Sequence, residues 1–224
     1  IITYFFVKDD EKLESDKISF KGIGKVLKMP AVWIISFVTF SNYVFTQSLY
    51  YFTPYSTNFF AASVTFAATL ASVRRWFSIF GSVGGGILTD KFGTGKTLLV
   101  SFLIMIAGTA AILLLPLESG SLAAFTIMFL IIFIFYNVNY AMTWAMMDAG
   151  AINVEYSGTA AGVISTIGYL PEIFCPILAG NLIDNNPGIT GFRYYFGFLI
   201  AMLVLGVVFV LIWNSYLKKQ KQKQ

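Results

Sequence analysis

The sequence contains no histidine and only one cysteine, Cys175. A single cysteine excludes an intrachain disulfide, and without histidine the chain can build neither a histidine-based metal cluster nor a Ser-His-Asp hydrolase triad. Any proton chemistry near neutral pH must therefore use carboxylates. A phosphate-binding loop of the Walker type and paired carboxylates at catalytic spacing are also lacking. We therefore expect no enzyme, no cofactor, no metal site and no nucleic-acid partner.

Charge is scarce as well: only 12% of the 224 residues are charged, whereas 57% are hydrophobic and the mean hydropathy is +0.75. Soluble domains average about 25% charged residues, so this chain could not cover a surface that faces water. Several apolar runs reach the roughly 20 residues that cross a bilayer as a helix. The sequence therefore predicts an all-α fold, a polytopic membrane protein with the lipid bilayer as its surroundings.

The chain is predicted to divide into four parts. Residues 1–7 look like the end of a truncated preceding helix, because the chain begins without methionine inside an apolar run, as a fragment would. Residues 8–30 form a charged cytoplasmic linker that ends in a short amphipathic helix, 31–217 a six-helix transmembrane bundle and 218–224 a basic cytoplasmic tail. The six predicted spans are 31–53, 63–89, 97–115, 122–147, 157–182 and 192–214.

The lysines predict how the bundle is oriented. With six spans, the lysines of the linker, of the loop after the second span and of the tail all fall on one side, while the other side has only Arg193. Cytoplasmic loops carry the excess of lysine and arginine. We therefore expect a multi-pass protein of the cell membrane, the inner membrane of a bacterium, with both ends of the bundle in the cytoplasm.

Two adjacent arginines lie inside the second predicted span. Arg74 and Arg75 precede Asp90 by 16 and 15 residues, which at the helical rise places them roughly 22–24 Å from the cytoplasmic end. Charges at this depth are costly and usually functional, and a guanidinium suits a small anion, so both are candidate substrate-binding residues. Their side chains point about 100° apart, which leaves open which of them faces a cavity. The alternative is an ion pair with an acidic residue such as Glu172.

Glu172 is the best candidate for a proton carrier. It continues a helical stripe of small residues through the fifth span, and Pro171 and Pro176 interrupt backbone bonding near it and can bend the helix. We expect Glu172 to act in proton coupling or gating, with a static structural pair as the alternative.

Two further stripes combine polar and aromatic side chains, which can line a substrate path or make interhelical hydrogen bonds. Both interpretations stay open. The stripes comprise Tyr43, Gln47 and Tyr50 in the first span, and Asn137, Tyr140 and Trp144 in the fourth. Trp33 and Trp213 lie near span ends, where we expect them to act as interface anchors.

The loop after the second span reads Gly86-Ile-Leu-Thr-Asp-Lys-Phe-Gly-Thr-Gly-Lys96. This pattern resembles the loop signature of major facilitator superfamily transporters. The matching positions are Gly86, Leu88, Asp90, Lys91, Gly93 and Lys96. The usual basic pair after Gly93 is replaced by Thr94 and Gly95, which suits the weaker copy in the second half of the family's fold. The resemblance implies that this loop acts as a latch between conformations, with Asp90 facing a helix of the first half; the alternative is a simple turn that sets topology.

Two other stretches extend the resemblance. Residues 155–162 and 167–184 are similar to the family's eleventh helix, most of all in bacterial nitrate/nitrite and sugar-phosphate permeases, and residues 26–33 resemble its central loop running into the seventh helix. The resemblance covers essentially the whole chain and identifies it as the C-terminal six-helix half of such a transporter.

The resemblance implies a secondary active transporter, a symporter or an antiporter, that moves a small polar or anionic solute by alternating access, coupled to protons. The expected partners are the solute, the bilayer and a missing N-terminal six-helix half. The alternative is a transporter-like membrane sensor or assembly subunit that does not transport. Because fold does not choose function, the sequence leaves the substrate, the coupling ion and the direction of transport open.

Overall fold

The computed structural model describes residues 20–222, and every element in this range is helical. Residues 1–19, with the predicted helix end and most of the predicted linker, and residues 223–224 of the predicted tail lie outside this range. The elements are α2 (Phe20–Val26), α3 (Pro30–Phe59), α4 (Val64–Phe92), α5 (Thr94–Leu114), the 3-10 turn η2 (Ser119–Ser121), α6 (Leu122–Ala149), α7 (Val154–Gly168), α8 (Pro171–Asp184) and α9 (Ile189–Lys221).

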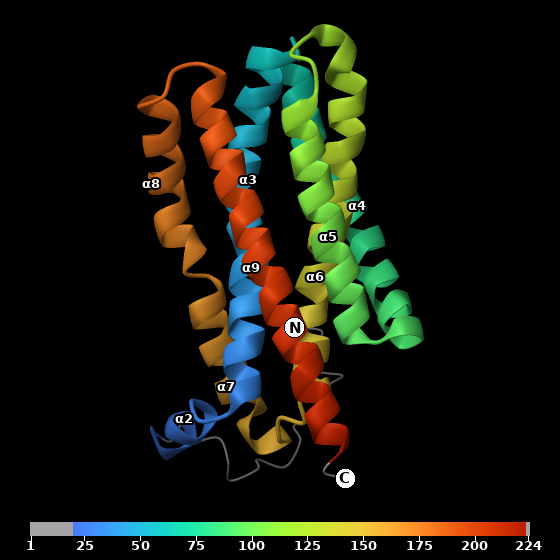
Figure 1. Cartoon of the computed structure of the whole chain (residues 1–224), viewed down its shortest axis with the longest axis vertical. Coiled ribbons are helices and arrows are strands. Elements are labelled where there is room, and N and C mark those ends of the chain that lie inside the picture. The colour runs from blue at the N-terminus through green and yellow to red at the C-terminus, as the bar shows by residue number, and fades with distance from the viewer. Residues whose placement is uncertain (1–19, 223–224) are drawn as a thin grey trace, which may run out of the picture.

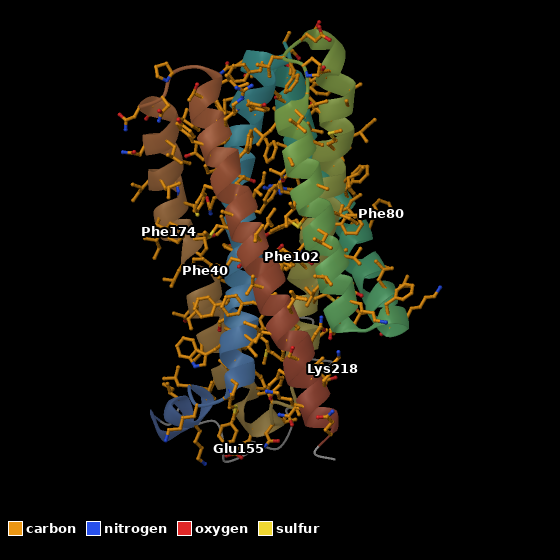
Figure 2. The ribbon with its side chains drawn as sticks, in the orientation of Figure 1. Phe40, Phe80, Phe102, Glu155, Phe174 and Lys218 are labelled. Carbon is orange, nitrogen blue, oxygen red and sulfur yellow. The ribbon has the colours of Figure 1, made fainter. Side chains whose placement is uncertain are left out.

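The long helices run side by side and alternate in direction (Figure 1). Each predicted span falls on one helix, or on the pair α7–α8, to within three residues at most ends; α3 continues six residues beyond its predicted end to Phe59, and α9 seven residues to Lys221. The short helix expected at the end of the linker is α2. It lies at the same end of the bundle as the end of α9, the end at which Figure 2 labels Glu155 and Lys218.

Within residues 20–222, four segments are both long and apolar enough to cross a membrane, which supports a membrane protein. They are Thr94–Leu114, Ser119–Ala149, Val154–Asp184 and Ile189–Gln220. Helices α3 and α4 are not among them, although both have the length. Their hydropathy is reduced by polar residues, including Asn42 and Gln47 in α3 and the arginine pair in α4. Six spans therefore remain a prediction.

Aromatic side chains fill the centre of the bundle between α3, α6 and α9. The ring of Phe52 on α3 lies 5.2 Å from that of Phe129 on α6 and 5.1 Å from that of Phe196 on α9. Trp213 is also fully buried, so the prediction that it anchors the chain at the membrane interface is wrong. The end of α9 packs against its neighbours there, a tertiary contact that position along a span does not reveal. Trp33 is 40% exposed and donates a hydrogen bond to the carbonyl of Leu27.

Helix α4 approaches α6 closely because glycines face the contact. A Cβ placed on Gly81 would lie 2.5 Å from the carbonyl oxygen of Ile134 and 2.8 Å from the Cβ of Asn137. One helical turn later, a Cβ on Gly85 would lie 3.3 Å from the Cα of Val138. Small residues at such spacing let helix backbones meet in a bilayer.

The fifth predicted span consists of two helices and not one. α7 ends at Gly168 and α8 begins at Pro171, with Tyr169 and Leu170 in the turn between them. Proline at the start of α8 lacks the N–H that would continue the preceding helix. The predicted bend is confirmed as a break. Gly168, Cys175 and Ala179 of the predicted stripe are buried, whereas Glu172 is exposed.

Candidate functional site

A cavity of about 1070 Å³ lies between α3, α4 and α8. It brings together four of the predicted site residues, namely Gln47, Arg74, Arg75 and Glu172. The rest of its lining is Thr46, Tyr50, Thr53, Pro54, Ala71, Ser72, Trp76 and Ile79. Two guanidinium groups and one carboxylate thus line the same cavity. Most of its lining comes from α3 and α4, the two long helices of lower hydropathy.

Arg74 is half-buried at the contact between α4 and α6. Its guanidinium carbon lies 5.3 Å from the ring centroid of Phe133 on α6, a distance at which a cation is attracted to the face of a ring. Its Nε atom is buried and has no hydrogen-bond partner among the described residues. Gly81, two helical turns further along the same face, brings α4 against α6, so the close helix contact also seats Arg74.

Arg75 is exposed on the neighbouring face of α4. Both arginines line the cavity, but they differ in surroundings: the guanidinium of Arg74 lies against an aromatic ring, and the side chain of Arg75 is exposed. The sequence could not choose between them, since the choice depends on which face of α4 meets α6.

Glu172 lies in the first turn of α8 and is exposed at the cavity. Its Oε1 accepts a hydrogen bond of 2.7 Å from the hydroxyl of Tyr43 on α3. A carboxylate in the first turn of a helix is also stabilised by the helix dipole. Among the described residues Glu172 pairs with this phenol and makes no ion pair with Arg74 or Arg75.

Tyrosines connect this carboxylate to α6. The ring of Tyr43 lies 4.4 Å from that of Tyr169 in the α7–α8 turn, and the hydroxyl of Tyr169 lies 3.4 Å from that of Tyr140. Tyr140 stacks on Tyr136 at 6.4 Å, and the hydroxyl of Tyr136 is hydrogen-bonded to Thr46, a lining residue of the cavity. Sequence reasoning missed Tyr136 and Tyr169, although both stand next to residues that it selected.

The remaining stripe residues lie elsewhere. Asn137 is half-buried and donates a hydrogen bond to the carbonyl of Phe133 in its own helix, and Trp144 is 45% exposed. Tyr43, Asn137, Tyr140 and Trp144 do not line the cavity. Tyr43 and Tyr140 are linked to its lining through the tyrosine contacts, whereas Asn137 lies at the contact of α6 with Gly81 of α4.

The loop with the family signature is a tight turn between α4 and α5. Gly93 ends α4 and precedes α5 with a φ of 82°, a conformation that glycine adopts without strain. Asp90, Lys91 and Lys96 are exposed around it, and Gly86 is half-buried one turn earlier. Within residues 20–222, no group of three or more His, Cys, Asp or Glu side chains could hold a metal ion.

Residues 1–176 match the sequence model of the Major Facilitator Superfamily. The chain belongs to this family. Because members of the family are transporters, membership supports a transport protein rather than an enzyme. The match and the helices together confirm the expected kind of membrane fold in general terms.

Curated relatives agree with this assignment. The chain is 27% identical to the inner membrane protein YihN of Escherichia coli strain K12, with all of the chain and 55% of that protein covered. It is 26% identical to the inner membrane protein YqcE of the same strain, with coverage of 97% and 53%. It is 30% identical to the probable nitrate transporter NarT of Staphylococcus haemolyticus over 62% of the chain and 33% of that protein. The chain thus spans about half the length of the two Escherichia coli relatives. Their names, together with the four long apolar segments, support a multi-pass membrane location.

Proposed function

We propose that this chain is the C-terminal six-span half of a secondary transporter that carries a small anion by alternating access. Family membership and the cavity between α3, α4 and α8 support the proposal. In this fold two halves enclose a site between them, and the chain is about half as long as its first relatives. Transport is therefore proposed to need a second six-helix half.

The observation that carries the choice of an anion is the pair of guanidinium groups in one cavity. Arg74 presents a buried Nε without a partner among the described residues, and planar guanidinium forks bind planar or tetrahedral anions through paired hydrogen bonds. Because one relative is named a probable nitrate transporter, nitrate is the first solute to test. Gln47, which lines the cavity, would supply a neutral hydrogen-bonding group beside the cations.

Glu172 is proposed to couple transport to protons. Its carboxylate is held by the phenol of Tyr43, and protonation would weaken that charge-assisted hydrogen bond. Since Tyr43 is on α3 and Glu172 is on α8, breaking the bond would loosen the start of α8 from α3, while the hydrogen bond from the hydroxyl of Tyr51 to the carbonyl of Pro176 would still join the two helices. The proton would then change how two cavity-lining helices are joined.

The turn between α4 and α5 is proposed as the cytoplasmic latch. Gly86, Asp90, Lys91, Gly93 and Lys96 are its residues, and Asp90 is exposed where a helix of the other half could meet it. Lys25, Lys28 and Lys218 lie at the same end of the bundle, which supports a cytoplasmic location for this end by the excess of positive charge.

The test uses a protein that contains both halves, reconstituted in vesicles with labelled nitrate. Arg74→Ala and Arg75→Ala should each lower uptake by about tenfold or more, because each removes hydrogen bonds to a charged ligand. Arg193→Ala, at the opposite end of the bundle in α9, is the matched control and should transport normally. Wild-type uptake in both cavity variants would overturn the proposed site.

The same vesicles separate coupling from translocation. Glu172→Gln should abolish uptake driven by a proton gradient and keep nitrate counterflow, whereas Asp184→Asn, at the far end of α8, should retain both. Saturable nitrate binding without counterflow in the wild-type protein would instead favour the sensor alternative.

A further inference from the structure

A second, mostly apolar groove lies away from the candidate solute site, at the lysine-rich end of the bundle. It has a volume of about 260 Å³ and is formed by α4, α5 and Phe135 of α6. Its lining is Leu88, Phe92, Lys96, Thr97, Val100, Ser101 and Phe135. In Figure 1 the turn between α4 and α5 stands out at the side of the bundle.

Two lysines stand at the mouth of this groove. Lys96 is exposed and lines it directly. The ammonium of Lys91 lies 5.3 Å from the ring centroid of Phe92, another lining residue. Asp90 is the acidic residue of the same turn, so the local balance of these three charges is positive.

The start of α5 adds unsatisfied hydrogen-bond donors. The N-cap position is Gly93, which has no side chain to cap the first turn, so the first amides of this helix lack intrahelical partners. Thr97, which follows Lys96 and also lines the groove, is only 5% exposed. Its hydroxyl has no hydrogen-bond partner among the described residues. A buried hydroxyl without a partner beside a ligand-sized groove would gain a hydrogen bond from an acceptor bound there.

We propose that this groove binds one anionic phospholipid. Its phosphate accepts hydrogen bonds from Lys96, from the first turn of α5 and from Thr97, since a helix N-terminus with nearby cations is a ready anion site. One acyl chain lies along Leu88, Phe92 and Val100. An anionic phospholipid can contact both the apolar wall of the groove and the lysines at its rim. A soluble anion would contact only the lysines, and a neutral lipid would gain no charge interaction with them.

The site is distinct from the solute cavity, although Lys96 and Lys91 also belong to the loop proposed as a latch. Helix α4 carries both sites: the arginines face the cavity in its first half, and Leu88 and Phe92 face the groove in its last turns. A lipid bound at the groove would thus hold the end of α4 against α5.

The test is native mass spectrometry of the full chain in detergent with added phosphatidylglycerol or phosphatidylcholine of identical acyl chains. The wild-type chain should retain one phosphatidylglycerol in preference to phosphatidylcholine. Lys96→Gln should weaken phosphatidylglycerol retention about fivefold, the contribution of one lysine near an anionic headgroup, and Thr97→Val should weaken it by a similar factor by removing the hydroxyl. Lys28→Gln, a lysine at the same end but away from the groove, is the control and should bind as the wild type does.

Val100→Trp tests the groove without changing charge. Val100 is 53% exposed, so a larger side chain can fill the groove without entering the core, and the variant should lose the retained lipid while its circular dichroism stays unchanged. Equal retention of both lipids, or undiminished retention in Lys96→Gln and Val100→Trp, would overturn the proposal. So would glycerol phosphate competing as well as the lipid, because the acyl chain supplies most of the affinity of a lipid. These readings are of bound lipid, so they stand or fall independently of transport.

Discussion

Substitution by alanine should have different effects on stability at two glycines of α4 that look alike in the sequence. Gly81 and Gly84 are three residues apart in the same helix, and both would gain helix propensity on substitution by alanine, about 1 kcal/mol each. The added Cβ at Gly81 would lie 2.5 Å from a backbone oxygen of α6, which cannot rotate away, whereas nothing lies within 4 Å of a Cβ at Gly84. Overpacking of this kind costs about 1–3 kcal/mol.

Because the propensity gain is common to both variants, the difference between them isolates the cost of the α4–α6 contact. Gly81→Ala should therefore be less stable than Gly84→Ala by about 1–3 kcal/mol in the free energy of unfolding, measured by reversible denaturant unfolding in the same detergent. Gly81→Ala should also raise the solvent accessibility of the Arg74 side chain, since α4 must move from Phe133. Equal stability of the two variants would show that α4 does not approach α6 as described.

Three further outcomes are expected. Tyr43→Phe should lower the free energy of unfolding by about 1 kcal/mol by removing the hydrogen bond to Glu172. Tyr50→Phe, at an exposed tyrosine that lines the cavity, should leave it unchanged. Equal effects of the two substitutions would show that the hydrogen bond does not stabilise the fold. The pKa of Lys25 in α2 is raised above its usual 10.5 by the hydrogen bond to Tyr156; the stabilisation is complete below that usual value and is lost only as pH rises through the raised pKa. Hydrogen exchange of α2, corrected for intrinsic rate, should thus be constant from about pH 6 to 9, and a change in protection there would contradict it. Cys175 is fully buried, so maleimide labelling should be slow in the native chain and rapid after unfolding, with fast native labelling as the contrary result.

The sequence predicted the helices well, because apolar runs of about 20 residues carry a strong local signal. It also predicted that the arginine pair and Glu172 are near a polar space. The partner of Glu172 could not be predicted, since Tyr43 is 129 residues away along the chain and the sequence offered two arginines as the more obvious partners. Glu172 meets the phenol from the first turn of α8, directly after the break at Tyr169 and Leu170.

Other differences have the same origin in tertiary contacts. Trp213 looked like a residue of the membrane interface, yet it packs in the interior, where its ring lies 5.6 Å from that of Tyr216. Asn137, Tyr140 and Trp144 share a helical face, but that face is divided between the contact with α4 and more open surroundings. Periodicity places residues on a face, and only the packing of neighbouring helices decides what each part of the face meets.

The low hydropathy of α4 has a consequence for how the protein is made. Each arginine at mid-span raises the free energy of inserting an isolated helix by about 2.5–3.5 kcal/mol, so α4 should be a poor substrate for insertion when it leaves the ribosome. The contact between α4 and α6, where Arg74 lies against Phe133, cannot form at that moment, because α6 is synthesised later. Stable entry of α4 into the bilayer should therefore await α6, and a nascent chain halted before Leu122 should leave the arginine segment accessible from the aqueous side.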